Sequence, residues 1–354
     1  MTDDARLESL QGWLAARLGG PVALAARGRP GSGFSADNLI FTATVGERTS
    51  THVLRVDSPH AQPYPEQAAG LGTGVALQSA TMQALRATVP VAPVVGVELD
   101  DGVLGAPFMV MDFVDGVVPK ETPPYTAEGF YLDADPDLRT AMITHGLTAL
   151  AAVHSVDWRG GELAVLDIGV EEPGSARQLG LWDTHLRNGL RDRSADIFDT
   201  ALERLRSTLP PQPAADDVVL LWGDARLGNI IWDPTRGTPR ALTDFEGTAV
   251  GERELDLGWW LMADRWMHEG SGMARLAGEP TRDEQVAIYA TAAGRPVAQL
   301  DWYELFAAYR FATTVVFVMN QWEQAGAVPA DHTIWRDNPA TELLAAILQE
   351  MVPS

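Results

Sequence analysis

Two aspartates and one asparagine between residues 218 and 246 stand out as a candidate metal-binding set. Asp224 and Asp244 each follow a short apolar run, and Asn229 lies on the loop five residues after Asp224. An apolar strand that ends in an acid holds the carboxylate rigidly at the edge of a core. Carboxylate and amide oxygens suit Mg²⁺, a hard cation that takes one or two carboxylates together with substrate phosphates. The residues therefore predict a magnesium site that also contacts phosphate.

The spacing of these residues separates a catalytic interpretation from a structural one. Any one of the acids alone fits a role in capping a turn or a strand end. Together they form Asp-x₄-Asn followed by Asp-Phe-Glu at 244–246, which matches the kinase catalytic loop and its metal-binding element. In that loop the aspartate accepts the proton of the substrate hydroxyl, while the asparagine and the second aspartate hold metal. The pattern therefore favours phosphoryl transfer over capping.

The composition is that of an acidic, globular chain without cysteine. Its 354 residues carry 26 Lys and Arg against 48 Asp and Glu, a net charge of −22, and 46% of them are hydrophobic. The hydrophobic share suffices for packed cores, and the acidic balance disfavours nucleic acid and anionic membranes as partners. The absence of cysteine excludes disulfides and fits a reducing compartment, so we expect a cytoplasmic protein. No apolar stretch reaches the ~18 residues of a membrane span, and residues 1–10 lack a signal-peptide pattern.

Hydrophobic periodicity divides the chain into a strand-rich part and a helix-rich part. After a helix at 4–18, strands are predicted at 22–26, 38–45, 51–56, 91–97 and 108–114, with a helix at 75–87 between them. Helices follow at about 136–155, 175–190, 194–208, 254–268, 283–293, 300–324 and 338–351, interrupted by a strand-loop-strand cluster at 218–243. We expect an α+β fold with a small antiparallel-sheet lobe at 1–114, a hinge near 112–116 and a larger, mainly helical lobe at 115–354. Small-molecule sites usually lie between such lobes.

The chain resembles the aminoglycoside phosphotransferase-like family of small-molecule kinases, in particular the branch similar to the kinase domain attached to some acyl-CoA dehydrogenases. The resemblance spans about Gly28 to Trp260. It rests on Trp-Gly-Asp-Ala-Arg-Leu-Gly-Asn at 222–229, Asp-Phe-Glu at 244–246 and Gly-Glu-Arg-Glu-Leu-Asp-Leu-Gly at 251–258. It implies a protein-kinase-like bilobal fold. It also implies transfer of a phosphoryl group from ATP or GTP to a hydroxyl of a small molecule, with Mg²⁺.

The resemblance assigns roles to the residues of the loop. Asp224 would be the catalytic base that orients the acceptor hydroxyl, and Arg226 would meet the transferred phosphoryl group as a cation. Asn229 and Asp244 would bind the Mg²⁺ that bridges the nucleotide phosphates. Glu246 stands where protein kinases have glycine, and either help to a second metal or capping of the next turn would explain it.

Further positions are implied to support the loop or to hold the nucleotide. The backbone around Asp112 and Val114 would meet the adenine edge. Asp256 would be a buried acid that receives backbone N–H groups from the catalytic loop. Trp222 replaces the histidine that usually begins the motif, and its indole N–H is expected to support the same loop. His154, at the end of a predicted helix, is expected to be packed and hydrogen-bonded rather than a ligand.

The phosphate end of the nucleotide site departs from the family pattern. A phosphate-covering hairpin, or equally a plain tight turn, would explain the loop that contains Gly31, Ser32, Gly33 and Ser35. Kinases place a lysine on the third strand, paired with a helix glutamate, but Lys120 is the only lysine of this chain. Arg55 is the candidate replacement, because a guanidinium is always charged and binds phosphate bidentately. Gln78 occupies the position expected for the glutamate, and Glu66 is the other candidate partner.

These residues leave two hypotheses about activity. The first is a small-molecule kinase, favoured because the set of Asp224, Asn229 and Asp244 is complete. The second is a kinase-fold binding module with weak or no catalysis, motivated by Arg55 in place of lysine and by Trp222 in place of histidine. For the acceptor, the dehydrogenase-linked branch suggests a hydroxyacyl thioester or another hydroxyl-bearing metabolite, partly apolar because the helical part is rich in tryptophan. Antibiotic resistance is the alternative role, and the residues indicate no oligomeric state.

Overall fold

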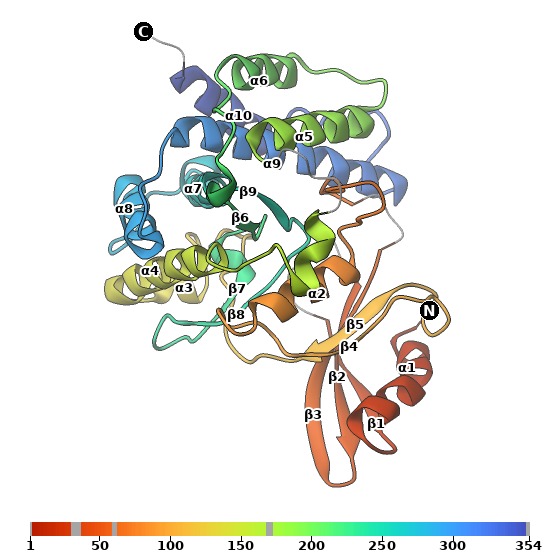
Figure 1. The fold of residues 1–354 in the computed structure, drawn as a ribbon. Helices are drawn as coiled ribbons and strands as arrows, with labels where there is room; N and C mark the ends of the chain where they lie inside the picture. The colour runs from red at the N-terminus through yellow and green to blue at the C-terminus, as the bar shows by residue number, and fades with distance from the viewer. Residues whose placement is uncertain (1, 30–36, 59–61, 168–172, 352–354) are drawn as a thin grey trace.

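The N-terminal part of the protein is an antiparallel sheet. The computed structural model describes residues 2–29, 37–58, 62–167 and 173–351. Five strands have the order β1-β2-β3-β5-β4 (Figure 1). They are β1 (Ala23–Gly28), β2 (Asp37–Val45), β3 (Arg48–Val56), β4 (Val94–Glu98) and β5 (Phe108–Asp112). The predicted phosphate loop with Gly31, Ser32, Gly33 and Ser35 lies outside the described residues, between β1 and β2.

Helix α1 (Asp3–Leu18) packs against this sheet and ends at Gly19, whose φ of +81° favours glycine. Its buried leucines form an apolar cluster with alternate residues of the strands, among them Leu39, Phe41 and Leu54. Side chains alternate between the two faces of a strand. Arg55, next to Leu54 on β3, is therefore directed away from this cluster and reaches Asp244 in the helical part.

Helix α2 (Val75–Leu85) follows β3 and begins at a carboxylate. Oδ1 of Asp57, just after β3, accepts the Val75 N–H at 2.9 Å, which caps the helix where a negative charge is favourable. A Cβ at Gly74 would meet the Asp57 carboxylate, so any larger residue there would displace this cap. The buried side chains of α2 pack with Met109 of β5 and with the core of the helical part.

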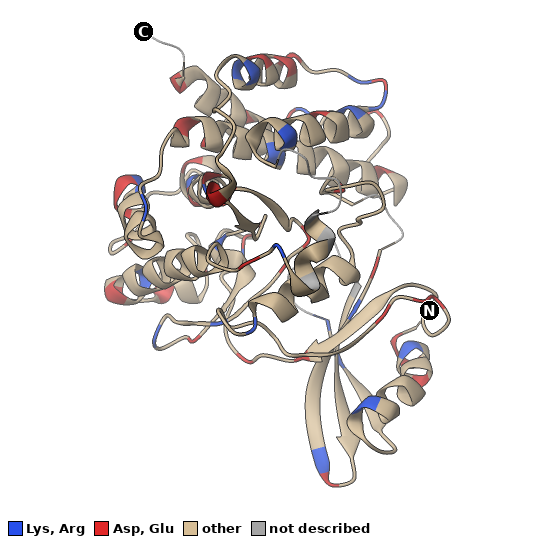
Figure 2. Ribbon diagram, in the orientation of Figure 1, with Lys and Arg blue, Asp and Glu red and all other residues tan. Residues whose placement is uncertain are grey.

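Helix α9 (Leu300–Gln324) is the central element of the helical part (Figure 1). It packs against α5 (Ser175–Leu190), α6 (Asp196–Ser207), α7 (Glu254–His268) and α10 (Pro339–Glu350). The other helices are α3 (Phe130–Asp133), α4 (Pro136–Val153) and α8 (Arg282–Ala293), of which α4 and α8 pack together. Acidic and basic residues are interspersed along the outer helices, so the charge is spread over the molecule (Figure 2). Of the helices described, none has the length and apolarity needed to cross a membrane.

Four short strands hold the two segments that carry Asp224 and Asp244. Strand β6 (Val218–Leu221) pairs with β9 (Ala249–Glu252), and β7 (Ile230–Trp232) pairs with β8 (Pro239–Leu242). The loop 222–229 therefore connects β6 to β7, and the segment 243–248 connects β8 to β9. Each of these two segments thus joins one strand pair to the other, so the two segments lie close together.

The predicted α+β class is confirmed, and most predicted elements form within a few residues of the expected bounds. Helices at 175–190, 254–268 and 300–324 have the predicted ends. Strand β9 was not predicted, because only four residues form it and they stand directly before α7. The last strand of the sheet ends at Asp112 and α3 begins at Phe130, so the proposed boundary between 114 and 115 falls in this connection.

Buried polar contacts fasten this connection to the helical part. The Thr126 hydroxyl donates to the Met267 carbonyl at 2.7 Å, and the Tyr131 hydroxyl donates to Glu279 Oε1 at 2.9 Å. His268 Nε2 lies 2.9 Å from Glu279 Oε2. Burial alone would lower the pKa of His268, but the hydrogen bond with Glu279 and the nearby charge of Asp264 outweigh it and raise that pKa above 6.5.

We expect His268 to make the protein more stable at acidic than at basic pH. Its pKa is higher in the folded state, so its stabilisation is complete below pH 6.5 and is lost as the pH rises through the raised value. The difference in melting temperature between wild type and His268→Gln should therefore shrink from about pH 6 to about pH 9. His145→Gln is the control, because His145 contacts the Gly237 carbonyl and no carboxylate. A difference that grows with pH would contradict the expectation.

Candidate active site

The loop that carries Asp224 is held by a buried carboxylate. Asp256, at the start of α7, is fully buried and accepts the backbone N–H groups of Trp222 at 2.6 Å and Gly223 at 2.9 Å. Its Oδ2 also lies 3.1 Å from Nε2 of His154, whose Nδ1 is 2.6 Å from the Tyr289 hydroxyl. The predicted supporting role of Asp256 is confirmed, and so is the prediction that His154 is packed and hydrogen-bonded.

Trp222 joins this loop to the segment that carries the second aspartate. Its indole N–H donates to the Thr243 carbonyl at 2.8 Å, and the Thr243 N–H donates to the Asn229 carbonyl at 2.9 Å. Gly223 has a φ of +87°, and a Cβ there would lie 1.9 Å from the Gly247 carbonyl oxygen. Only glycine allows the two segments to approach so closely. Trp222 is thus a scaffold residue, as predicted.

Asp224 is an engaged, buried carboxylate. It is 6% exposed, and its Oδ1 accepts the Trp259 indole N–H and the Arg226 Nε–H, each at 2.8 Å. Oδ2 accepts from Arg226 Nη2 at 3.2 Å, and the Tyr64 side chain also forms a hydrogen bond with this aspartate. Burial alone would raise the pKa of Asp224, but the guanidinium of Arg226 and the hydrogen bonds outweigh it and hold that pKa below 3.8. The carboxylate is therefore ionised at neutral pH.

Arg226 lies beside Asp224, as the sequence predicted, and is held between two carboxylates. Its second partner is Glu121, from the connection before α3. Burial would lower the pKa of Arg226, and the charges of Asp224 and Glu121 outweigh this and raise it well above the usual value. The cation is thus permanent and positioned next to the base, while its contact with a phosphoryl group stays a prediction.

Arg55 contacts the segment 244–246 rather than a helix glutamate. Its Nη1 donates to Asp244 Oδ1 at 3.0 Å, and its Nη2 forms an ion pair with Glu246. Burial would lower the pKa of Arg55, but the charges of Asp244 and Glu246 outweigh burial and raise that pKa. The two carboxylates fix the guanidinium at the junction of the sheet and the short strands.

The predicted partners of Arg55 are therefore wrong. Gln78 Nε2 donates to the Thr73 carbonyl at 2.9 Å, and Glu66 Oε2 accepts the Gly70 N–H at 3.4 Å. The partner is Glu246, which is 4% exposed and takes the place of a helix glutamate as the counter-charge. The sequence differs from the kinase pattern at both positions: arginine replaces the strand lysine, and an acid replaces the glycine after Asp-Phe. These two differences together could have indicated the ion pair.

Asn229 and Asp244 offer oxygen donors of the kind that Mg²⁺ binds. The side-chain nitrogen of Asn229 donates to the backbone carbonyl of Asp224 at 3.0 Å. The side-chain oxygen of Asn229 therefore remains an acceptor. Asp244 has one oxygen on Arg55, and its side chain is 33% exposed. Its φ of +56° is a left-handed conformation that aspartate tolerates better than most residues. No group of three or more His, Cys, Asp or Glu side chains suited to a metal occurs in the described part of the chain, and the predicted pair has one carboxylate.

The predicted adenine-contacting backbone lies at the end of β5. The Asp112 N–H donates to the Pro93 carbonyl at 2.9 Å, and Asp112 Oδ1 lies 3.1 Å from Nδ1 of His52. Val114, two residues further on, is half-buried and follows the sheet directly. The Asp112 N–H is therefore already used, and a contact of this backbone with the adenine edge stays a prediction.

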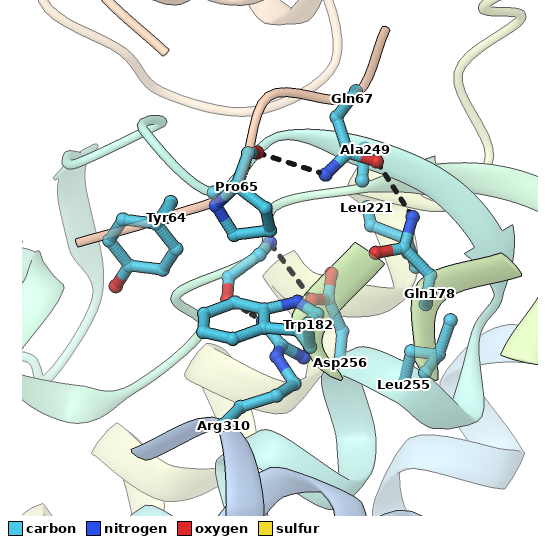
Figure 3. A pocket seen from close by; sticks show the side chains of 12 residues that line it. Tyr64, Pro65, Gln67, Gln178, Trp182, Leu221, Ala249, Leu255, Asp256 and Arg310 are labelled. Atoms are coloured by element: carbon cyan, nitrogen blue, oxygen red, sulfur yellow. Dashed lines mark hydrogen bonds between the residues drawn. The ribbon is translucent and has the colours of Figure 1, made fainter. Parts of the chain in front are cut away.

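A pocket beside the loop contains residues that the sequence did not reveal (Figure 3). Its free volume is only about 10 Å³, roughly the room of one water molecule. Its walls include residues from six separate segments, among them Tyr64, Gln67, Trp182, Gly223, Asp256 and Arg310. Trp182, a buried tryptophan of the helical part, is one of the wall residues. Neither Tyr64 nor Arg310 belongs to a recognisable sequence motif, so the sequence did not indicate them.

The fold is shared with solved structures that are described as phosphotransferases. A solved structure from Ralstonia eutropha JMP134, provisionally described as an aminoglycoside phosphotransferase, is 24% identical, with a TM-score of 0.70 and coverage of 97% of this chain and 98% of that one. A ternary complex of the aminoglycoside phosphotransferase APH(4)-Ia with ADP and hygromycin B is 15% identical, with a TM-score of 0.52 and coverage of 98% and 100%. The protein-kinase-like fold predicted from the sequence is thereby confirmed.

The family follows from the sequence comparison. A profile described as "Phosphotransferase enzyme family" matches residues 28–306, so the chain belongs to this family and is a phosphotransferase. Acyl-CoA dehydrogenase family member 10 of Mus musculus is 28% identical over 242 residues, 65% of this chain and 21% of that protein. Probable acyl-CoA dehydrogenase IBR3 of Arabidopsis thaliana is 24% identical over 351 residues, 89% of this chain and 39% of that protein. The chain thus spans well under half the length of these relatives.

Proposed function

We propose that the protein transfers the γ-phosphate of ATP or GTP to a hydroxyl group of a small molecule, with Mg²⁺ and with Asp224 as the base. The observation that carries the proposal is the state of Asp224, an ionised carboxylate fixed on a loop whose backbone is bound by Asp256. A positioned base is required because phosphoryl transfer depends on orientation and electrostatics more than on covalent chemistry.

The residues around Asp224 fit the steps that this reaction needs. The Tyr64 side chain hydrogen-bonds the Asp224 carboxylate, which suggests that a hydroxyl group can reach the base. An acceptor alcohol in that place would give its proton to Asp224 as it attacks the phosphorus. Arg226 keeps a positive charge beside the reacting oxygens. Asn229 and Asp244 would hold Mg²⁺, which would neutralise charge on the nucleotide phosphates.

Arg55 is proposed to bind the nucleotide phosphates in place of the usual lysine. Its ion pairs with Asp244 and Glu246 keep the guanidinium in position. A nucleotide that arrives with Mg²⁺ brings a cation for Asp244 and anions for Arg55, so it can replace one of these ion pairs without leaving either charge uncompensated.

We expect Glu246→Gln to raise the KM for nucleotide by roughly 10-fold, because it removes one of the two carboxylates that fix Arg55. Glu66→Gln is the matched control, since Glu66 lies outside this ion pair. Steady-state kinetics with varied nucleotide measure both variants. Equal KM values for Glu246→Gln and wild type, or a larger effect of Glu66→Gln, would contradict the assignment of Glu246.

The second candidate function is a kinase-fold module that binds a ligand without efficient transfer. The observation that favours it is the crowding of Asp224 by Arg226, Trp259 and Tyr64. Both candidates are tested with purified protein, Mg²⁺ and ATP or GTP. The shift in melting temperature measures nucleotide binding, and the release of nucleoside diphosphate in the presence of each acceptor of a panel measures transfer. Transfer supports the first candidate, and a melting shift without transfer to any acceptor supports the second.

The acceptor class is part of the proposal. Hydroxyacyl thioesters belong in the panel because the two curated relatives are described as acyl-CoA dehydrogenases. Aminoglycosides belong there because the structural relatives are described as phosphotransferases of these antibiotics. A cytoplasmic location, where both nucleotides are available, completes the proposal and rests on the absence of cysteine.

A further inference from the structure

Arg310, in the middle of α9, is a buried cation with no carboxylate in direct contact among the described residues. It is 6% exposed, and its Nη2 donates to the Gly223 carbonyl at 2.9 Å. Its Nε is buried and has no acceptor in the part of the chain that the structure describes. Burial lowers the pKa of Arg310, which reflects the cost of holding this charge away from water. Apolar side chains of similar size often replace buried charges without loss of stability, so stability alone does not explain the arginine.

The surroundings of Arg310 leave no room for a substrate. The pocket whose wall includes this residue holds about one water molecule, which could accept from Nε (Figure 3). Asp256 lies on the same wall, and its charge and that of Asp224 oppose the effect of burial on the pKa of Arg310. The role of this cation therefore follows from its contacts within the chain.

Gly223, the hydrogen-bond partner of Arg310, stands directly before Asp224 in the chain. Its N–H donates to Asp256 at 2.9 Å, and its carbonyl accepts from Arg310 at 2.9 Å. Two charged side chains therefore hold the backbone on either side of this glycine. The peptide group between Gly223 and Asp224 includes this carbonyl and is planar. Holding the carbonyl thus fixes the Cα from which the Asp224 side chain starts.

Trp259, on α7, provides a second connection between Arg310 and Asp224. The central guanidinium carbon of Arg310 lies 4.6 Å from the centre of the Trp259 ring, and the indole N–H donates to Asp224 Oδ1 at 2.8 Å. A ring face attracts a cation without using its N–H groups. The backbones of α7 and α9 approach closely beside this contact, since a Cβ at Gly258 would lie 2.7 Å from the backbone of Tyr303. The indole is thereby held with its N–H toward the base.

Resting on the proposed function, we propose that Arg310 is the residue that positions the base, Asp224. It acts through the Gly223 carbonyl and through the ring of Trp259. Arg226, which contacts Asp224 directly, is the cation proposed to meet the transferred phosphoryl group. When Arg226 turns toward that group, Trp259 remains as a donor to Oδ1 of the base. Arg310 secures this donor and occupies neither oxygen of Asp224 itself.

The first test compares turnover with stability in Arg310→Met, using the whole chain with Mg²⁺, ATP and the best acceptor of the panel. Methionine adapts to the space of the side chain but has neither its charge nor its donors. We expect kcat to fall by roughly 10- to 100-fold, because small displacements of a catalytic group are costly. The nucleotide KM should stay within about a factor of two, and the melting temperature should equal that of wild type or exceed it. Arg310→Lys, which keeps a charge and an N–H donor, should recover part of kcat.

Two further variants separate positioning from packing. Arg193→Met is the matched control, because Arg193 also lies 4.6 Å from a tryptophan ring, that of Trp335, and also donates to a backbone carbonyl, that of Gly189. It should leave kcat within about a factor of two. Trp259→Phe keeps a ring but removes the N–H that bonds the base, so Arg310→Met should cost less in this background than in wild type. Equal costs in the two backgrounds would contradict action through Trp259.

Hydrogen exchange at the Trp259 indole N–H gives a readout that needs no transfer. It is followed by NMR of protein with isotope-labelled tryptophan, and the signal is assigned by its loss in Trp259→Phe. In Arg310→Met this N–H should exchange at least about 10-fold faster, because its hydrogen bond to Asp224 loosens. In Arg193→Met the rate should stay that of wild type.

The outcomes separate this inference from the proposed function. Faster exchange in Arg310→Met, without transfer by wild type to any acceptor, would support the positioning role and count against the kinase activity. Normal turnover of Arg310→Met would overturn the role and leave the activity intact. An exchange rate equal to that of wild type would also overturn it. A melting temperature that falls together with kcat, without recovery in Arg310→Lys, would assign Arg310 to the fold alone and overturn the inference.

Discussion

Asp224→Asn is expected to lower kcat by about 100- to 10,000-fold while nucleotide binding persists. The amide has the size of the carboxylate and can still accept the Trp259 indole N–H, so the loop keeps its packing. It cannot take the proton of the acceptor hydroxyl, and it no longer neutralises Arg226. Coupled detection of ADP release gives kcat, and the melting shift with Mg²⁺ and ATP gives binding.

The control for this variant is Asp233→Asn, which removes an aspartate from the turn after β7. Asp233 accepts N–H groups of its own turn and pairs with Arg240, away from the base. Its substitution should leave kcat within a factor of about two, since surface substitutions have small effects. Full turnover of Asp224→Asn would assign the base to another group and would remove the main support for the proposed mechanism.

The catalytic loop could be predicted from the sequence because its information is local. Apolar runs of four residues or fewer deliver Asp224 and Asp244 to strand ends, and the spacing of Asn229 from Asp224 fixes both on one loop. The role of Asp256 was predictable from the family resemblance, which the motif Gly-Glu-Arg-Glu-Leu-Asp-Leu-Gly at 251–258 carries. In each case the residue type and its neighbours in the chain carry the signal.

The partners of these residues could not be predicted, because they come from distant segments. Arg55 and Glu246 are 191 positions apart, and no periodicity relates a strand of the sheet to the turn after β8. Arg310 lies in a long apolar helix, where an arginine looks like a surface residue until packing buries it. Tyr64 belongs to a segment of irregular structure. Tertiary packing alone decides which of these groups meet the loop.

The ion pair between Arg55 and Asp244 joins the residue proposed to bind the nucleotide phosphates to the residue proposed to bind the metal. In the absence of nucleotide, Asp244 compensates Arg55, and each would exchange this partner for one of opposite charge when metal and phosphate arrive. Such an exchange would make metal and nucleotide binding mutually favourable, because the metal would replace Arg55 beside Asp244 while the phosphates would replace Asp244 beside Arg55. Glu246, more deeply buried, would hold Arg55 in place during the exchange.

Asp244→Asn is therefore expected to abolish the dependence of nucleotide binding on Mg²⁺ and to weaken binding in its presence by more than about 100-fold. Asparagine keeps the size of the side chain and tolerates the φ of +56°, so the variant removes charge with little backbone strain. Titration calorimetry with ATP in Mg²⁺ and in chelator measures both affinities. Asp115→Asn is the control, because its exposed side chain pairs with Arg240.

The same variant makes an opposite prediction for metal-free nucleotide. Without the Asp244 charge, Arg55 keeps only Glu246 as its counter-charge and should attract phosphate more strongly. Affinity for ATP in chelator should then stay equal to that of wild type or increase. A parallel loss of affinity in Mg²⁺ and in chelator would mean that Asp244 supports the fold of the site rather than the metal, whereas a loss confined to Mg²⁺ assigns the metal to this carboxylate.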